Sequence, residues 1–415
     1  MTARRVLFAL TVLAFSACAK PSDNGSGSGG SNGTGGGSSG GSTGSGGSSS
    51  TGSGGSNSPP AGLGTGKGFS FPQNKVTGSC TLTTVGNASS VTQSAYQTWK
   101  GTFVVSGNPG LRVQRPENGN DTVSEGIGYG MLAAVYMADQ STFDGLWTYA
   151  QAHIDPKGLM NWHITSGGST ASDGSYSASD GDEDMIFALL MASDQWSGTD
   201  YLTPAQNMIT AMRNYSLFSD GTLQNGDNFN TANTLNIDYF SPAYFRVFSK
   251  AVSDPYWTSI AIPANYKHLM AQAGSKGLVP DSSNLQDQTS CSTCKPNYSY
   301  DACRTPWRIA LDWCWNAEPK AQAYLQLIGA FFNGVGASNI VDGYNSTGGT
   351  TSGNHNLAFS GPAGVAGMAG FQSLLDGSFN LMVSPPSGNT NYFPQTLRIL
   401  SMLAMSGNFL DYSQM

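Results

Sequence analysis

The chain has 415 residues, with 19 Lys and Arg against 26 Asp and Glu, which gives a formal net charge of -7. We do not expect a nucleic-acid-binding protein, because the chain lacks the excess of basic residues that such binding requires. Charged residues make up only 11% of the chain, against about 25% in ordinary soluble domains. Hydrophobic residues still reach 39% and lie almost wholly outside one low-complexity stretch, so the remainder can bury a large core.

The N-terminus has the features of an export signal. Two arginines precede residues 6–17, an apolar run that is too short to cross a hydrocarbon core of about 30 Å but fits a signal peptide. The run leads into the sequence F-S-A-C, which resembles the bacterial lipobox. We therefore expect residues 1–18 to be a signal peptide with a lipid anchor on Cys18, which holds the protein at the outer membrane or cell surface. Ordinary cleavage near Ala17 or Ala19, with secretion, is the alternative.

Residues 19–67 consist almost entirely of Gly, Ser, Thr and Asn. Such a segment cannot offset the entropy lost on ordering, so we expect a flexible tether. No second linker interrupts residues 68–415, which we expect to form one domain.

Apolar residues with a period near 3.6 predict helices along most of this domain. In chain order, the predicted segments are 130–138, 146–154, 185–196, 205–217, 244–252, 266–273, 308–315, 321–332, 364–375 and 396–405, with a further helix near 91–99. Patterns typical of long strands are scarce. Because the chain is too long for a simple bundle, we expect an all-α fold in which helical hairpins form a closed ring.

Acidic residues stand directly ahead of three of these helices, at Glu125, in a run that begins at Asp180, and at Asp301. Acids are common at helix N-termini, so each could be a simple cap. If alternate helices form an inner ring, however, their N-termini converge and these carboxylates line one cleft. A protonated carboxyl paired with an ionised one is what an inverting glycosidase needs, and nearby rings such as Trp162 and Tyr300 suit stacking on sugars.

Three motifs resemble glycoside hydrolase family 8. They are S-E-G-I-G-Y-G-M at residues 124–131, A-S-D-G-D-E-D-M-I at 178–186 and Y-D-A-C-R-T-P-W-R at 300–308, in the order found in that family. Ile186 departs from the alanine of the family pattern. This apolar exchange within a helix concerns packing rather than chemistry.

The resemblance implies an (α/α)6 barrel of inner and outer helices with an acidic, aromatic-lined cleft. It implies Glu125 as general acid and Asp301 as general base. It also implies that substrate is bound by Asp180, Trp162, Tyr300, Arg304 and Tyr392. The aspartate at position 301 and the Pro-Trp-Arg that follows resemble the family's endoglucanases more than its xylanases.

The implied activity is endo-acting, inverting hydrolysis of internal β-1,4-glucosidic bonds in cellulose or mixed-linkage β-glucan, by a monomer without cofactor or metal. A xylanase or chitosanase of the same family is one alternative. A non-catalytic carbohydrate-binding lipoprotein is another, although the presence of both Glu125 and Asp301 argues against it.

The proposed acid needs a special environment. A helix N-terminus favours an ionised carboxylate, which suits a base such as Asp301 and works against an acid that must keep its proton. We therefore expect burial, or a neighbouring ionised Asp180, to raise the pKa of Glu125. Arg304 lies three residues after Asp301, on the same helical face and within reach of it.

Five cysteines follow Cys18, at positions 80, 291, 294, 303 and 314. Disulfides are the main expectation for an exported chain, with a four-cysteine zinc site and free thiols as alternatives. The odd number leaves at least one thiol unpaired. Cys303 and Cys314 are not expected to pair, because eleven helical residues separate them by about 16 Å. The sequence leaves the pairing otherwise open.

Overall fold

The computed structural model describes residues 62–228 and 233–415. The expected signal peptide, the lipobox and most of the expected tether lie outside these residues. The described residues form twelve α-helices: α1 (Ala88–Phe103), α2 (Ser124–Tyr136), α3 (Gln140–Gln151), α4 (Ser179–Gln195), α5 (Leu202–Tyr215), α6 (Pro242–Val252), α7 (Ile262–Gln272), α8 (Thr305–Asn316), α9 (Pro319–Val335), α10 (Leu357–Gly367), α11 (Gln372–Val383) and α12 (Tyr392–Met405).

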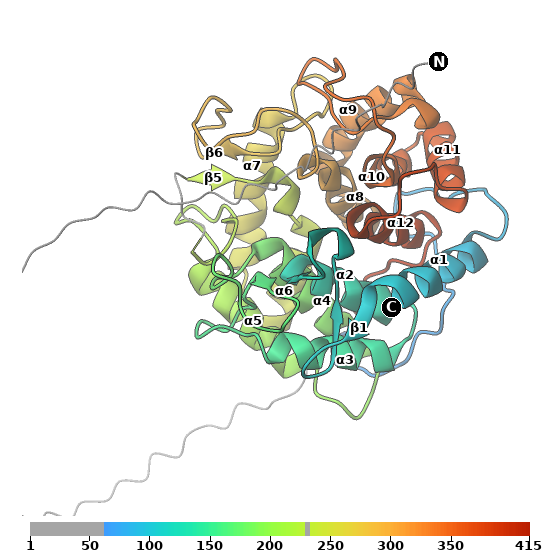
Figure 1. The fold of residues 1–415 in the computed structure, drawn as a ribbon. Coiled ribbons are helices and arrows are strands. Elements are labelled where there is room, and N and C mark those ends of the chain that lie inside the picture. Colours follow the sequence, from blue (N-terminus) through green and yellow to red (C-terminus); the bar gives the residue numbers. More distant parts are fainter. Residues whose placement is uncertain (1–61, 229–232) are drawn as a thin grey trace, which may run out of the picture. The chain divides into compact units, whose positions relative to one another are not determined.

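The even-numbered helices form an inner ring. Each contacts the next in the order α2, α4, α6, α8, α10 and α12, and α12 closes the ring against α2. Every residue of α4 and α10 is buried, and in α2 every residue except Glu125 is buried. The odd-numbered helices surround this ring and bury one face each (Figure 1). The expected (α/α)6 barrel is therefore confirmed.

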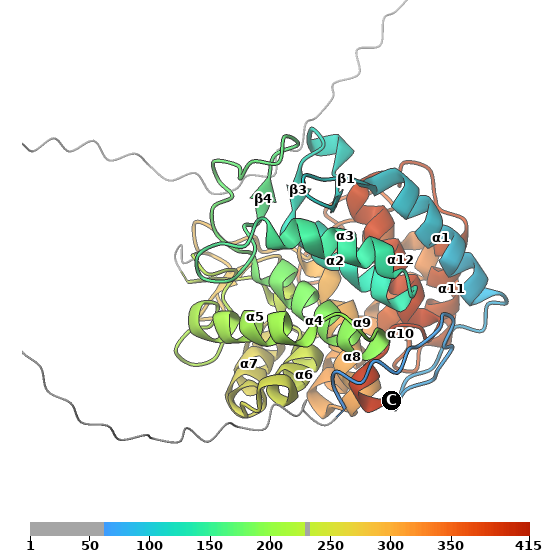
Figure 2. The same cartoon turned by 90° about the horizontal axis from the view of Figure 1, so that it is seen from below.

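Short strands and turns join the helices. Three antiparallel pairs occur among the described residues: β1 (Val104–Ser106) with β2 (Leu111–Val113), β3 (Thr122–Val123) with β4 (His163–Ile164), and β5 (Thr234–Leu235) with β6 (Ser283–Asn284). A π-helical turn, Trp257–Ala261, precedes α7, and 3-10 turns cover Pro116–Asn118, Ile237–Tyr239, Ala302–Arg304, Ala337–Asn339 and Tyr412–Gln414. Figure 2 shows β3 and β4 at one end of the helical ring, on the side away from the C-terminus.

The predicted helices agree with the observed ones except in one place. The predicted segment 364–375 joins the end of α10 to the start of α11, which the structure separates by residues 368–371. Apolar residues continue across the break, so hydrophobic periodicity does not mark it. Gly370, at a φ of 112°, adopts a backbone conformation that a helix does not allow and that favours glycine.

The cysteines form disulfides rather than a zinc site. Cys80 pairs with Cys314, and Cys291 pairs with Cys294. Cys303 keeps a buried free thiol, in agreement with the expectation that it does not pair with Cys314. The first disulfide ties the segment ahead of α1 to the C-terminal part of α8.

Contacts with the barrel begin a few residues ahead of position 68. Leu63 is buried, and the backbone N–H of Gly66 donates to the carbonyl of Ser193 at 3.1 Å. Thr65 donates to Asp194 through both its backbone N–H and its hydroxyl, at 3.0 Å each. Across the described ranges, we find no helix with the length and apolar character needed to cross a bilayer.

Candidate active site

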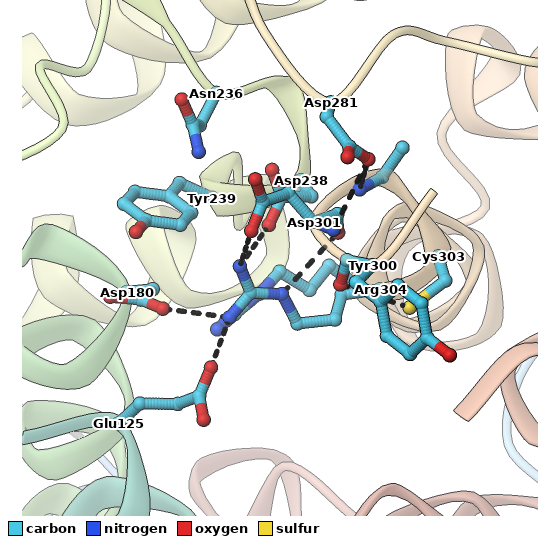
Figure 3. A network of polar contacts seen from close by, with 12 residues as sticks. Glu125, Asp180, Asn236, Asp238, Tyr239, Asp281, Tyr300, Asp301, Cys303 and Arg304 are labelled. Atoms are coloured by element: carbon cyan, nitrogen blue, oxygen red, sulfur yellow. Dashed lines mark hydrogen bonds and ion pairs between the residues drawn. The ribbon is translucent and has the colours of Figure 1, made fainter. Parts of the chain in front are cut away.

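The N-terminal ends of five inner helices supply polar side chains to one cluster. The contributors are Glu125 from α2, Asp180 from α4, Asp238 ahead of α6, Asp301 and Arg304 ahead of α8, and Tyr392 at the start of α12. The convergence that the sequence analysis made conditional on an inner ring is therefore observed. Figure 3 shows four of these carboxylates around the guanidinium of Arg304.

Arg304 is the centre of the cluster, and its side chain is only 3% exposed. Its Nη1 lies 2.5 Å from Glu125 Oε2 and 2.8 Å from Asp180 Oδ2. Its Nη2 lies 2.6 Å from Asp238 Oδ2 and 3.6 Å from Asp301 Oδ1. The expected contact with Asp301 is present, but it is the longest of the four. One buried cation thus holds together carboxylates from four segments that are far apart in the sequence.

Glu125 lies on an otherwise buried helix, but its side chain is partly exposed. It is the one α2 residue that is not buried, and its side chain is 17% exposed. Its Oε1 accepts a hydrogen bond from the hydroxyl of Tyr392 at 2.9 Å. Burial raises the pKa of Glu125 above its usual range; Asp180 raises it further, while Arg304 and Tyr392 act in the opposite direction. The environment expected for the acid, burial together with Asp180, is present.

Asp301 faces two cations. One oxygen is directed to Arg304, and the other lies 3.3 Å from the ammonium group of Lys295. The Asp301 side chain is 26% exposed, so it remains accessible to solvent. Its backbone N–H donates to Asp281 Oδ1 at 3.1 Å. Glu125 and Asp301 therefore contact different nitrogens of the same guanidinium.

The sequence analysis did not identify Asp238 or Tyr239. Asp238 is fully buried, and burial raises its pKa well above the usual range. The ring of Tyr239 lies 5.3 Å from the Arg304 guanidinium. A signal was available: Asp238 precedes the predicted helix 244–252 in the same way that the three recognised acids precede theirs.

Trp162 lies beside the first turn of α2. Its carbonyl accepts the backbone N–H of Ser124 at 2.9 Å, and its indole N–H donates to the carbonyl of Asp173 at 2.7 Å. Its ring lies near that of Tyr176, with centroids 6.5 Å apart. This backbone contact places the carbonyl of Trp162 beside Ser124, the residue that precedes Glu125.

Tyr300 is oriented differently from the other expected site residues. Its hydroxyl donates to Asp342 Oδ2 at 2.5 Å, on the side away from Glu125 and Asp180 (Figure 3). Its ring packs edge-on against Phe359 of α10. The structure thus brings together Glu125, Asp180, Asp301, Arg304 and Tyr392, whereas the hydroxyl of Tyr300 points toward the loop that carries Asp342.

A second group of charged residues is more deeply buried than the Arg304 cluster. Arg308 pairs with both oxygens of Asp184, at 3.0 and 2.8 Å, and both side chains are fully buried. Asp182 accepts the backbone N–H of Met160 and is also fully buried, so it has no access to a ligand. Within residues 62–228 and 233–415, no three His, Cys, Asp or Glu side chains are arranged to hold a metal ion.

The comparisons with known proteins agree with this geometry. Residues 69–407 match the sequence model of glycosyl hydrolases family 8. The chain belongs to this family. It is 34% identical over 342 residues to Endoglucanase C of Ruminiclostridium cellulolyticum, covering 80% of this chain and 74% of that protein. It is 31% identical over 366 residues to the Beta-glucanase of Niallia circulans, covering 78% and 87%.

A comparison with solved structures gives the same result. The apo structure of a β-1,3-1,4-glucanase from Paenibacillus sp. X4 superposes with a TM-score of 0.75 at 30% sequence identity, covering 82% of this chain and 99% of that chain. The membership predicted from the three motifs is confirmed, and so is the barrel that it implied.

Proposed function

We propose that this family 8 glycoside hydrolase is an endo-β-glucanase that cleaves internal β-1,4-glucosidic bonds of cellulose or mixed-linkage β-glucan with inversion. Relatives named endoglucanase and β-glucanase, at 34% and 31% identity over most of the chain, support the endo-acting glucanase. The structural neighbour named β-1,3-1,4-glucanase supports mixed-linkage glucan as one substrate.

The observation that carries this proposal is the placement of Glu125 and Asp301 on either side of the Arg304 guanidinium. Glu125 contacts Nη1 at 2.5 Å and Asp301 contacts Nη2 at 3.6 Å. Because the two Nη atoms are about 2.3 Å apart, the nearest carboxylate oxygens are separated by at most about 8.5 Å. This upper limit is compatible with the separation of about 6.5–9.5 Å that leaves room for a water in inverting enzymes, and also with the separation of about 5–5.5 Å in retaining enzymes, so the stereochemistry of the product decides between them.

Each carboxyl group suits one half of the reaction. The raised pKa of Glu125 favours the protonated form, which can donate a proton to the departing glycosidic oxygen. Asp301 lies between the ammonium group of Lys295 and the guanidinium of Arg304, and as the base it accepts a proton from the attacking water. In this scheme one displacement at the anomeric carbon breaks the glycosidic bond and forms the bond to water oxygen.

The other expected residues of the cluster have supporting roles. We assign Asp180 and Arg304 to orienting the ring at the cleavage point, with Tyr392 holding Glu125. We assign Trp162 to contact with a sugar ring, as the family resemblance implies. Tyr300 contributes through its ring, because its hydroxyl is already bound to Asp342.

A hydrolysis screen tests the substrate assignment. The purified protein is assayed on carboxymethylcellulose, lichenan, xylan and chitosan, with Glu125→Gln and the distant variant Asp376→Asn as a matched pair. We expect activity on the two glucans and a loss of several orders of magnitude in kcat for Glu125→Gln, with oligosaccharide binding retained in calorimetry. Asp376→Asn should keep wild-type kcat. Preferred hydrolysis of xylan or chitosan, or near-normal turnover by Glu125→Gln, would overturn the assignment.

We also propose that the protein is exported, anchored through a lipid on Cys18, and active as a monomer. The charged and apolar pattern of residues 1–18 supports export and anchoring, and a cluster built wholly from one chain supports a monomer. Cell fractionation should place the wild type with membranes and release Cys18→Ala. Light scattering should give the mass of one chain. Equal release of both proteins, or a dimer mass, contradicts these proposals.

A further inference from the structure

Asp281 accepts three backbone hydrogen bonds from the turn that carries the proposed base. Its Oδ1 receives the N–H groups of Ser299 at 2.9 Å, Asp301 at 3.1 Å and Ala302 at 2.9 Å. Asp281 is buried, with 6% of its surface exposed. Figure 3 shows its carboxylate directed at the backbone of this turn. One oxygen of a buried side chain therefore fixes the path of the main chain on both sides of Asp301.

Asp281 is itself held firmly. Its backbone N–H donates to the carbonyl of Asn297 at 2.8 Å. The next residue, Ser282, exchanges backbone hydrogen bonds with Lys295 at 3.1 and 3.2 Å and accepts the Lys295 N–H on its hydroxyl at 3.0 Å. The same Lys295 reaches the side chain of Asp301 at 3.3 Å. The segment that carries Asp281 is thus joined to Asp301 through the main chain and through a side chain.

The N–H groups at the start of the 3-10 turn Ala302–Arg304 need a hydrogen-bond acceptor, and a second aspartate provides it. Free N–H groups at the start of a helix are usually capped by the side chain of the N-cap residue. Asp301 occupies that position but makes no capping hydrogen bond with its own side chain. Asp281, from a different segment, accepts the N–H groups at this point instead.

We propose that Asp281 is a positioning residue for the reaction: it caps the turn in place of Asp301 and so leaves the Asp301 carboxylate free to face water and substrate. This inference rests on the proposed role of Asp301 as the base. Asp281 acts through the main chain and does not itself touch the sugar. Its contribution is the position of the base, which determines the rate of the step that forms the bond to water.

The acceptor oxygen of Asp281 is the feature that matters, rather than its charge. All three hydrogen bonds end on the same oxygen. Burial, together with the charge of Asp301, raises the pKa of Asp281 to about 7, so the group carries a proton for part of the time near neutral pH. An amide with its oxygen in the same place can accept the same three N–H groups.

Two substitutions at position 281 distinguish the effect of the acceptor oxygen from the effect of the negative charge. Asp281→Ala removes the acceptor, and we expect kcat to fall by about 100-fold while KM changes less than about twofold, because the base moves and the sugar contacts stay. Asp281→Asn keeps an acceptor oxygen, and we expect it to recover all but about threefold of kcat. Steady-state kinetics on a soluble β-glucan measures both.

A control variant separates positioning from simple loss of a helix cap. Asp139 caps the outer helix α3 by accepting the N–H of Thr142 at 3.2 Å, and its side chain contacts none of the residues around Arg304. Asp139→Ala should lower Tm and keep kcat. If Asp281→Ala also lowers Tm and keeps kcat, the positioning role is wrong. If Asp281→Asn is as impaired as Asp281→Ala, the account based on the acceptor oxygen is wrong.

The test also distinguishes this inference from the function on which it rests. Asp301→Asn must abolish turnover if Asp301 is the base, so an active Asp301→Asn overturns the proposed function. An inactive Asp301→Asn with a fully active Asp281→Ala overturns only the role of Asp281. If Asp281→Ala does not fold, Asp281→Ser replaces it: its short hydroxyl cannot reach all three N–H groups, so kcat should fall, and wild-type kcat would refute the proposal.

Discussion

The Nη1 atom of Arg304 donates to Oε2 of Glu125 at 2.5 Å, in a cluster where one guanidinium meets four carboxylates. The cluster therefore gathers four carboxyl groups around one guanidinium. Removing one partner of a buried ion pair leaves the others uncompensated and costs about 3–5 kcal/mol. This arrangement makes the stability of the barrel depend on the same residue that arranges the proposed site.

Arg304→Met should lower Tm more at about pH 8 than at about pH 5. Without the guanidinium, the pKa values of Glu125 and Asp238, already raised by burial, rise further. A carboxyl whose folded-state pKa is raised contributes stability below its unfolded pKa and loses that contribution as pH rises through the folded pKa. Thermal melts at the two pH values measure this difference. An equal loss of Tm at both would contradict it.

Two substitutions should move the alkaline limb of the kcat profile in opposite directions. The hydrogen bond from Tyr392 lowers the pKa of Glu125, so Tyr392→Phe should let the acid keep its proton to higher pH. The charge of Asp180 raises the pKa of Glu125, so Asp180→Asn should shift the same limb to lower pH. Profiles of kcat against pH for the three proteins test this.

The opposite directions of the two predicted pH shifts are the internal control for this comparison. A general disturbance of the site would reduce kcat in both variants without moving the limb in opposite directions. If both variants shift the limb the same way, Glu125 is not the group whose deprotonation ends activity at high pH.

The two disulfides should differ strongly in their effect on stability. Cys80 and Cys314 are separated by 234 positions, and loop-closure entropy assigns such a bridge about 5 kcal/mol. Cys291 and Cys294 are separated by only 3 positions, for which the same relation gives about 2 kcal/mol. Replacing both cysteines of each pair by alanine and comparing denaturant unfolding measures the two contributions. A larger loss for Cys291 and Cys294 would contradict this ordering.

Truncation should show where the folded domain begins. Removal of residues 1–61 leaves Leu63 and the hydrogen bonds from Thr65 to Asp194 in place, so Tm and activity should match the full chain. Removal of residues 1–68 deletes these contacts and exposes the side of α4 that they cover, so Tm should fall. Equal Tm values for the two truncations would mean that residues 62–68 add nothing.

Much of this architecture can be read from the sequence, because each helix repeats an apolar pattern that only a buried face explains. Glu125, Asp180 and Asp301 are recognisable as candidates because each stands at the start of such a helix and within one of the three family motifs. Periodicity failed at the α10–α11 break, where both sides are apolar and a glycine conformation ends the helix.

Other parts of the site depend on contacts that no local pattern contains. Asp281 and Lys295 lie in a loop without periodicity, and their importance follows only from hydrogen bonds to a turn that is 6 to 21 positions away. The direction of the Tyr300 hydroxyl is likewise set by Asp342, 42 positions later. A motif indicates that a tyrosine is present but not which partner its hydroxyl selects.

The stereochemistry of the first product tests the central claim most directly, because it reports whether Asp301 acts on water or a carboxylate acts on the sugar. Proton NMR of a β-glucan digest, recorded before mutarotation, resolves the anomeric signals of the new reducing ends. The account predicts that the α-anomer appears first, from a single displacement by water that Asp301 activates. Initial formation of the β-anomer would show a covalent intermediate and contradict the account.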